Sequence, residues 1–337
     1  MKRFFKELFA IEKHPTRGLM AFEWVIMTYL VVTLVVTLAF YDQAANPSIM
    51  IWRRIAVAAM TAVLWGIYRM VPCKAMKVVR VLAHMALLSR WYPDTYEFNR
   101  MLPNLDHLFA DAEQWLFGCQ PALLFSQIFD NKLFSELMCL GYSSYYPIIA
   151  AVCFYYLLRR PQEFERVIFV IVGVFFVHYT IFDLLPVAGP QYYYKAVGED
   201  MIAQGVFPNL HGYFFNNQEC LPIPGWEGGP FHHLVVHAHN AGERPTAAFP
   251  SSHMSVTIAL LFLAWHSKSR SLFFWLLPLG LLMFFATFYI KAHYAIDALA
   301  GLVSGILCYW VFMRYKGGRW AVTYANSFRK RKKSKKR

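Results

Sequence analysis

Residues 248–266 read AFPSSHMSVTIALLFLAWH and join a polar cluster directly to an apolar run. Pro250 suits the first turn of a helix, and the hydroxyls of Ser251 and Ser252 can cap its start. The unpaired backbone N–H groups of such a turn bind anions. The run that follows has the composition of a membrane-spanning helix. We therefore expect an anion-binding helix start at a membrane surface, with His253 in its first turn.

The whole chain has the composition of a membrane protein. Of its 337 residues, 58% are hydrophobic and 16% are charged, and the mean hydropathy is +0.35. One soluble core of this length rarely holds so many apolar residues. The expected fold class is all-α: a polytopic integral membrane bundle of about eight helices (six to eight), with interfacial helices on its outer face. The expected spans are residues 21–41, 51–71, 77–92, 145–159, 166–187, 253–267, 271–290 and 295–313.

Two of these runs need comment. Residues 77–92 carry Arg80 and Arg90, so this run could lie in the interface instead of crossing the membrane. Residues 21–41 follow a basic stretch, but the run is longer than a signal-peptide core and lacks a small-residue cleavage site, so we expect it to be retained.

Basic residues gather on one side of the expected spans. With eight crossings, both termini and most of the 33 lysines and arginines share one face, which the positive-inside rule makes cytoplasmic. The tail RKRKKSKKR at residues 329–337 is then expected to contact lipid headgroups and not nucleic acid. The short cytoplasmic loops favour a bacterial inner membrane with a periplasmic active site, and a Golgi membrane is the alternative.

Two segments between the spans, residues 93–142 and 188–252, are too long to be turns, and long loops of this kind usually carry function. The first has apolar residues at helical spacing, as short helices on a membrane surface would. We expect N-terminal membrane helices at 1–92, a catalytic membrane domain at 93–315 and a basic cytoplasmic tail at 316–337.

The second long segment contains FHHLVVHAHN at residues 231–240, which could be interpreted as a zinc site. No cysteine or carboxylate stands beside it at ligand spacing, so solvated histidines are the expected alternative and no metal or cofactor is predicted. Cys119, Cys139 and Cys220 fall on the outer side, where a disulfide could form, but their spacing indicates no pairing.

A second polar motif, KAHYAIDALAGLVSG, occupies residues 291–305. His293 and Asp297 are four residues apart on one helix face, where a carboxylate can bond one ring nitrogen and leave the other basic. Two spans and a turn separate His293 from His253, so both should reach the same outer face. Any one of these residues alone would more often be an ordinary polar group at a membrane surface, but their combination predicts a phosphate site.

The segments AFPSSHMS and HYAIDALAG resemble the second and third signature motifs of the type 2 phosphatidic acid phosphatase superfamily. HYxxD and LLPVAGPQYYY, residues 184–194, are most similar to its branch of inositol phosphorylceramide synthases, the inositolphosphotransferases. The resemblance covers about residues 90–315, including DHLFADAEQWLFGCQP. It implies a metal-independent reaction in which His293 is the nucleophile, Asp297 orients it and His253 is the general acid, through a phosphohistidine intermediate.

The sequence departs from the phosphatases of that superfamily at two motifs. Their third motif has Ser-Arg where this chain has Ala286 and Thr287, and the RRP at residues 159–161 falls on the expected cytoplasmic face, so it does not serve as their first motif. Other residues must then hold the phosphate. Besides the helix-start serines, those expected to do so are Lys291, Arg244, Gln191 and Tyr192.

The expected function is transfer of a phospho-headgroup to or from a lipid, as in inositol phosphorylceramide synthases. A lipid phosphatase acting on phosphatidate, a polyprenyl phosphate or diphosphate, or a lipid A-like phosphate is the alternative. A non-enzymatic lipid-binding scaffold is a second, but it would not need an oriented nucleophile. The expected partners are a phospholipid or lipid phosphate and the bilayer; nucleic acid is not expected, and the sequence indicates no oligomeric state.

Overall fold

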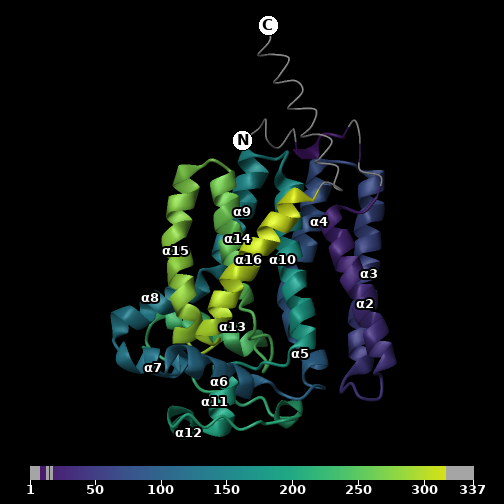
Figure 1. The fold of residues 1–337 in the computed structure, drawn as a ribbon. Coiled ribbons are helices and arrows are strands. Elements are labelled where there is room, and N and C mark those ends of the chain that lie inside the picture. The colour runs from purple at the N-terminus through teal and green to yellow at the C-terminus, as the bar shows by residue number, and fades with distance from the viewer. Residues whose placement is uncertain (1–7, 13–14, 16–17, 316–337) are drawn as a thin grey trace.

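The structure is a computed structural model that describes residues 8–12, 15 and 18–315 (Figure 1). Helices dominate, and these ranges contain no β-strand. The all-α membrane bundle predicted from the sequence is confirmed. The predicted basic tail at 316–337 lies outside the described residues.

Long helices form an upright bundle (Figure 1). Seven of the eight expected apolar runs each coincide with one helix, because runs of this length can satisfy their backbone polar groups in a membrane only internally. The bundle helices are α2 (Ala21–Ala39), α3 (Pro47–Met70), α4 (Lys74–Ala86), α5 (Leu88–Asn99), α9 (Tyr145–Arg159), α10 (Phe164–Leu184), α14 (Ser252–His266), α15 (Arg270–Tyr289) and α16 (Ala295–Arg314).

In the part of the chain that it describes, the structure contains fewer helices that are long enough to cross a membrane than the eight spans expected from the sequence. Within the described ranges, α2, α3, α10, α15 and α16 are long and apolar enough to cross a membrane. A sixth span results if α9 is joined to α8 (Lys132–Ser143), from which it is bent by 46°. At 15 residues α14 is shorter, and its length of about 22 Å is less than the ~30 Å of a hydrocarbon core.

The weak run at 77–92 is divided between α4 and α5, and the 13 residues of α4 are too few to cross a membrane alone. Arg80 of α4 is fully buried and forms an ion pair with the equally buried Glu23 of α2. In a second buried pair, Arg54 Nη2 of α3 lies 2.8 Å from Asp94 Oδ2 of α5. Buried charges are tolerated where they are paired, and these two pairs join the first helices of the chain to one another, α2 to α4 and α3 to α5.

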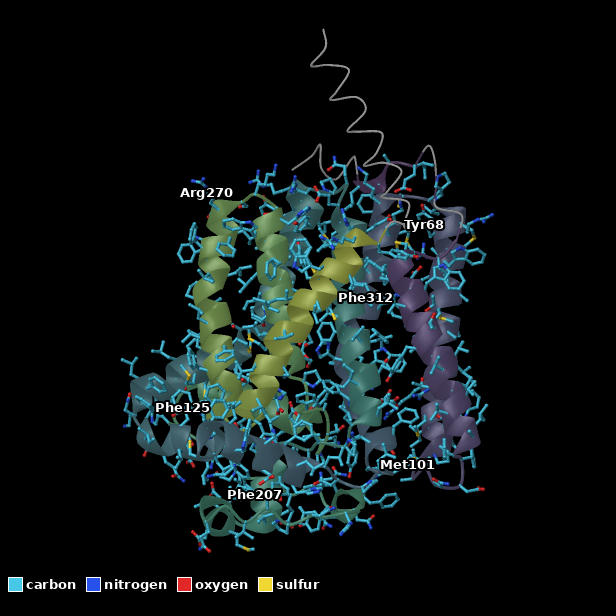
Figure 2. All side chains as sticks on the ribbon, viewed as in Figure 1. Tyr68, Met101, Phe125, Phe207, Arg270 and Phe312 are labelled. Carbon is cyan, nitrogen blue, oxygen red and sulfur yellow. The ribbon has the colours of Figure 1, made fainter. Side chains whose placement is uncertain are left out.

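Short helices form a layer across one end of the bundle, as predicted (Figure 1). Several of their apolar side chains face outward, among them Trp115 and Leu133, which is typical of helices that lie along a membrane surface. Phe125 lies in this layer (Figure 2) and connects it to the bundle. Its ring contacts those of Phe288 and Tyr289 of α15. The layer comprises α6 (Asp106–Phe117), α7 (Pro121–Ile128), α8, α11 (Pro190–Val197), α12 (Glu199–Ala203), α13 (Pro230–Gly242) and the 3-10 turn Tyr213–Phe215.

The two helices that follow the polar motifs, α14 and α16, pack against each other at very short range. A Cβ atom added at Gly301 would lie 2.5 Å from the Ser251 carbonyl oxygen, and one at Gly305 would lie 2.4 Å from that of Ser255. Only glycine permits such an approach of two backbones. A third contact joins them at the outer end, where Ser251 N donates to Asp297 O at 3.0 Å.

Candidate active site

His293 lies in the turn between α15 and α16, at the junction of the bundle and the outer layer. Its Nδ1 is 2.7 Å from the Ala248 carbonyl oxygen, at the start of the AFPSSHMS segment. A carbonyl only accepts hydrogen bonds, so Nδ1 carries the proton and Nε2 keeps its lone pair. Burial lowers the pKa of His293 to about 4, which keeps the ring neutral near pH 7.

His253 lies in the first turn of α14, and the structure brings it to His293. Its Nδ1 is 3.3 Å from His293 Nε2, where it can donate to the lone pair. The rings of Tyr142 and Tyr145 flank it at centroid distances of 4.6 and 4.5 Å. The N-cap residue Ser251 fixes this turn, because its hydroxyl accepts a hydrogen bond from Met254 N.

The predicted direct hydrogen bond between Asp297 and His293 is wrong. Asp297 Oδ2 is 3.8 Å from His293 Nδ1 and accepts a hydrogen bond from Tyr294 N at 2.8 Å, so the carboxylate caps the start of α16. The ring nitrogen is already engaged by Ala248. The other oxygen of Asp297, Oδ1, is buried and has no hydrogen-bond partner among the described residues. Asp297 therefore lies beside the imidazole without a direct hydrogen bond to it.

A small cavity of ≈ 20 Å³ adjoins both histidines. Four of the six residues expected to bind phosphate line it: Ser252, Arg244, Gln191 and Tyr192. The remaining lining residues are Tyr92, Tyr142, Ala188, Glu243, Thr246, Ala247, Ala292 and the two histidines themselves.

Two expected phosphate ligands lie elsewhere. Lys291 adopts a left-handed backbone conformation with φ 64° and forms an ion pair with Glu199 of α12, so its ammonium group points away from the cavity. Ser251 is fully buried and caps α14 without lining the cavity. Lys291 is close to His293 in the sequence, but the conformation of the turn at 290–294 determines which of its side chains face the cavity.

A family comparison covers this site. A family model described as the PAP2 superfamily matches residues 107–311, more than half of the 337-residue chain. The chain belongs to the PAP2 superfamily. It is therefore a membrane enzyme of the lipid phosphatase or phosphotransferase type, as its histidine motifs predicted. No match was found among curated proteins or among solved structures.

The PAP2 match begins in α6. Two acidic residues of this helix accept hydrogen bonds from the backbone of segments next to the site. Asp106 accepts hydrogen bonds from Ala188 N at 2.6 Å and Gly189 N at 2.8 Å, and Glu113 Oε1 accepts one from Ala295 N, the first residue of α16, at 2.6 Å. Burial raises the pKa of Asp106 and raises that of Glu113 to about 8. Sequence reasoning missed both roles, although two carboxylates seven residues apart on one face of a helix were a usable signal.

Sequence reasoning also missed four polar residues that line the cavity. Tyr92 and Tyr142 come from α5 and α8, and Glu243 and Thr246 follow α13. Thr246 Oγ1 is buried without a hydrogen-bond partner among the described residues, so it can donate to a phosphate oxygen. Nothing in the local sequence marks these residues, because they come from separate segments that only the fold brings together.

The histidine-rich helix α13 has other contacts. His232 Nε2 lies 3.1 Å from the Ile223 carbonyl oxygen, and His239 Nε2 lies 3.4 Å from Cys220 Sγ. Among the described residues, no group of three or more His, Cys, Asp or Glu side chains could hold a metal ion. Cys119, Cys139 and Cys220 are free thiols, so the structure contains no disulfide among them.

Proposed function

We propose that this PAP2 enzyme transfers a phospho-headgroup between lipids through a covalent intermediate on His293, in the manner of an inositol phosphorylceramide synthase. The observation that carries this proposal is the neutral His293 ring. The Ala248 carbonyl oxygen holds its Nδ1–H, and Nε2 keeps a lone pair beside His253 and the cavity. An oriented imidazole with one free nitrogen is the arrangement expected of a nucleophile.

The reaction would take two steps. Nε2 of His293 attacks phosphorus, the bond from phosphorus to the leaving oxygen breaks, and His253 gives its proton to that oxygen. An acceptor hydroxyl then attacks phosphorus, the nitrogen–phosphorus bond breaks, and the hydroxyl proton passes to His253. At 3.3 Å the two imidazoles are in direct contact, so the phosphoryl group must take the place of this hydrogen bond when it binds.

Three kinds of group would stabilise the negative charge on the phosphoryl oxygens. Arg244 contributes a cation, Thr246 and Ser252 contribute hydroxyls, and the start of α14 contributes backbone N–H groups. Asp297, 3.8 Å from the His293 ring, favours the positive charge that the ring gains on phosphorylation. Two unit charges at about this distance interact by about 4 kcal/mol at an effective dielectric constant of 20.

Several features favour a lipid substrate and a periplasmic site. The cavity lies where the outer layer meets the bundle, which is the depth of a lipid headgroup if α14 begins below the membrane surface. The opposite end of the bundle carries basic residues such as Arg159, Arg160 and Arg270, and Figure 2 places Arg270 far from the outer layer. By the positive-inside rule this basic end is cytoplasmic, in the inner membrane if the protein is bacterial.

Hydrolysis is the second candidate, and the size of the cavity favours it. A volume of ≈ 20 Å³ holds about one water molecule, which would lie next to both histidines. The same phosphohistidine serves both outcomes. Departure from the phosphatase motif at Ala286 and Thr287 favours transfer.

The deciding experiment uses purified protein in nanodiscs and a panel of phospholipids labelled on phosphorus, with or without ceramide or diacylglycerol. We expect a labelled lipid product, and a label on His293 that His293→Ala abolishes. His237→Ala, in an exposed part of α13, is the matched control and should behave like the parent. Labelled water-soluble product alone would support hydrolysis over transfer. Turnover that survives His293→Ala would refute both.

A further inference from the structure

Glu243 places a carboxyl group in a cavity that should receive an anionic phosphate. It is the C-cap residue of α13 and lines the same cavity as both histidines. Its Oε2 accepts a hydrogen bond from Tyr92 OH at 2.5 Å, and its Oε1 forms no hydrogen bond within the described part of the chain. Its carboxyl forms no ion pair with the adjacent Arg244 within the described residues, and Arg244 Nη1 donates to the backbone carbonyl oxygen of Glu243 at 2.6 Å.

A carboxylate in this place would weaken phosphate binding. Two negative charges about 5 Å apart repel by about 3 kcal/mol at an effective dielectric constant of 20, which corresponds to more than a hundredfold in affinity. Burial raises the pKa of Glu243 and so reduces this repulsion, but a neutral side chain would avoid it altogether. A carboxyl oxygen accepts hydrogen bonds, so it suits a substrate that also presents a donor, and an alcohol hydroxyl is such a donor.

The walls beside Glu243 suit a hydroxyl group that is carried on carbon. Tyr142 and Tyr192 contribute aromatic rings, and three alanines contribute methyl groups. Tyr92 lies on α5, outside the residues 107–311 that match the PAP2 family. This wall therefore combines the family core with a helix that is not part of the family match, as expected of a feature that sets specificity.

We propose that Glu243, held in place by Tyr92, binds an alcohol hydroxyl of the substrate, supplied by the acceptor lipid or by a polyol headgroup of the donor. This proposal rests on the proposed function of the same cavity. It identifies the substrate class as one in which an alcohol, not only a phosphate, is recognised. Tyr92 is a positioning residue, since it acts through the Glu243 carboxyl.

The test separates the two half-reactions. The parent, Glu243→Gln, Tyr92→Phe and the control Glu219→Gln, an exposed carboxylate of the outer layer, are incubated in nanodiscs with phosphorus-labelled donor until His293 is labelled. The label is then chased with an alcohol acceptor, ceramide or diacylglycerol, or with buffer alone. Phosphatidate, which has no headgroup alcohol, is compared with donors that carry glycerol or inositol headgroups.

We expect Glu243→Gln to lower the ratio of transfer to hydrolysis about tenfold or more, the size of a lost hydrogen bond to a charged group. Tyr92→Phe should lower this ratio less, and Glu219→Gln should leave it unchanged. If the chase is slowed, the hydroxyl is that of the acceptor; if labelling by polyol donors alone is slowed, it is that of the headgroup. A ratio of products is independent of how much of each variant folds.

The proposal is overturned if Glu243→Gln keeps parental rates in every arm. It is also overturned if this variant slows transfer to the alcohol and hydrolysis by water by one factor, and labelling by polyol donors and by phosphatidate by one factor. A parent that transfers phosphorus without ever labelling His293 would contradict the proposed function instead. That result would be visible before any Glu243 variant is compared.

Discussion

Replacing Glu113 by glutamine should change how the stability of the protein depends on pH. Glu113 lies under the start of α16, where Oε1 accepts the Ala295 N–H and Oε2 is buried without a partner among the described residues. Burial, with a further contribution from Asp297, raises its pKa from 4.5 to about 8. Its folded-state pKa is therefore higher than its unfolded-state pKa, and folding takes up a proton at pH values between the two.

The sign and size of the effect follow from that shift. Below pH 4.5 the carboxyl is protonated in both states and contributes nothing, whereas between pH 4.5 and about 8 only the unfolded state loses the proton. The free energy of unfolding then falls with rising pH, by a total on the order of 5 kcal/mol. Glutamine stays neutral at every pH and keeps a carbonyl oxygen for Ala295 N–H. Glu113→Gln should therefore be increasingly more stable than the parent as the pH rises.

The assay is denaturant unfolding in detergent micelles at pH 5, 6, 7 and 8, followed by tryptophan fluorescence. We expect the difference in unfolding free energy between Glu113→Gln and the parent to grow by several kcal/mol over this range. The exposed Glu219→Gln should track the parent. Glu113→Ala also lacks the titrating carboxyl but leaves the Ala295 N–H without a partner, so it should be about 1–3 kcal/mol less stable than Glu113→Gln at every pH. Parallel pH curves for Glu113→Gln and the parent would refute the reasoning.

Four further predictions concern turnover and stability. Because burial lowers the pKa of His293 to about 4, kcat/KM measured between pH 3.5 and 8 should stay level through pH 6.5 and fall only as His293 is protonated near pH 4; an acid limb at 6.5 would contradict this. Arg244→Ala should raise KM roughly tenfold or more. Lys291→Ala should leave KM unchanged and lower the apparent Tm, because Lys291 pairs with Glu199 outside the cavity, and the reverse pattern would exchange their roles. Asp297→Asn retains an oxygen for helix capping but loses a charge 3.8 Å from the ring, so kcat should fall by up to about a thousandfold, and an unchanged kcat would exclude the electrostatic role.

The helical fold could be predicted from the sequence because apolar runs determine where membrane helices form. The number of spans was predicted less accurately than the helical fold. With 15 residues, α14 is shorter than the five described helices that are long enough to cross a membrane, and its first turn, with Ser252 and His253, belongs to the site. The split of the run at 77–92 into α4 and α5 was also not visible, although its two arginines suggested that it differs from the other runs.

For the site, the sequence identified residues that share a motif and missed those that meet only in space. His253 and His293 come together because two antiparallel helices return them to one end of the bundle. The i, i+4 spacing placed Asp297 on the correct helix face, but it could not reveal that the Ala248 carbonyl oxygen occupies His293 Nδ1 first. Glu243 gave no signal in the sequence, since only folding brings it to the histidines.

The close packing of α14 against α16 determines which part of the enzyme can move. Gly301 and Gly305 let the two helix backbones touch, so the starts of α14 and α16, with His253 and Asp297, form one stiff unit without room for sliding. A phosphoryl group cannot fit between imidazoles 3.3 Å apart, and a volume of ≈ 20 Å³ must expand to admit a lipid headgroup. We therefore expect the cavity to open on the side opposite α14 and α16. The segment after α13 would move outward to admit the substrate, while His293 keeps its position.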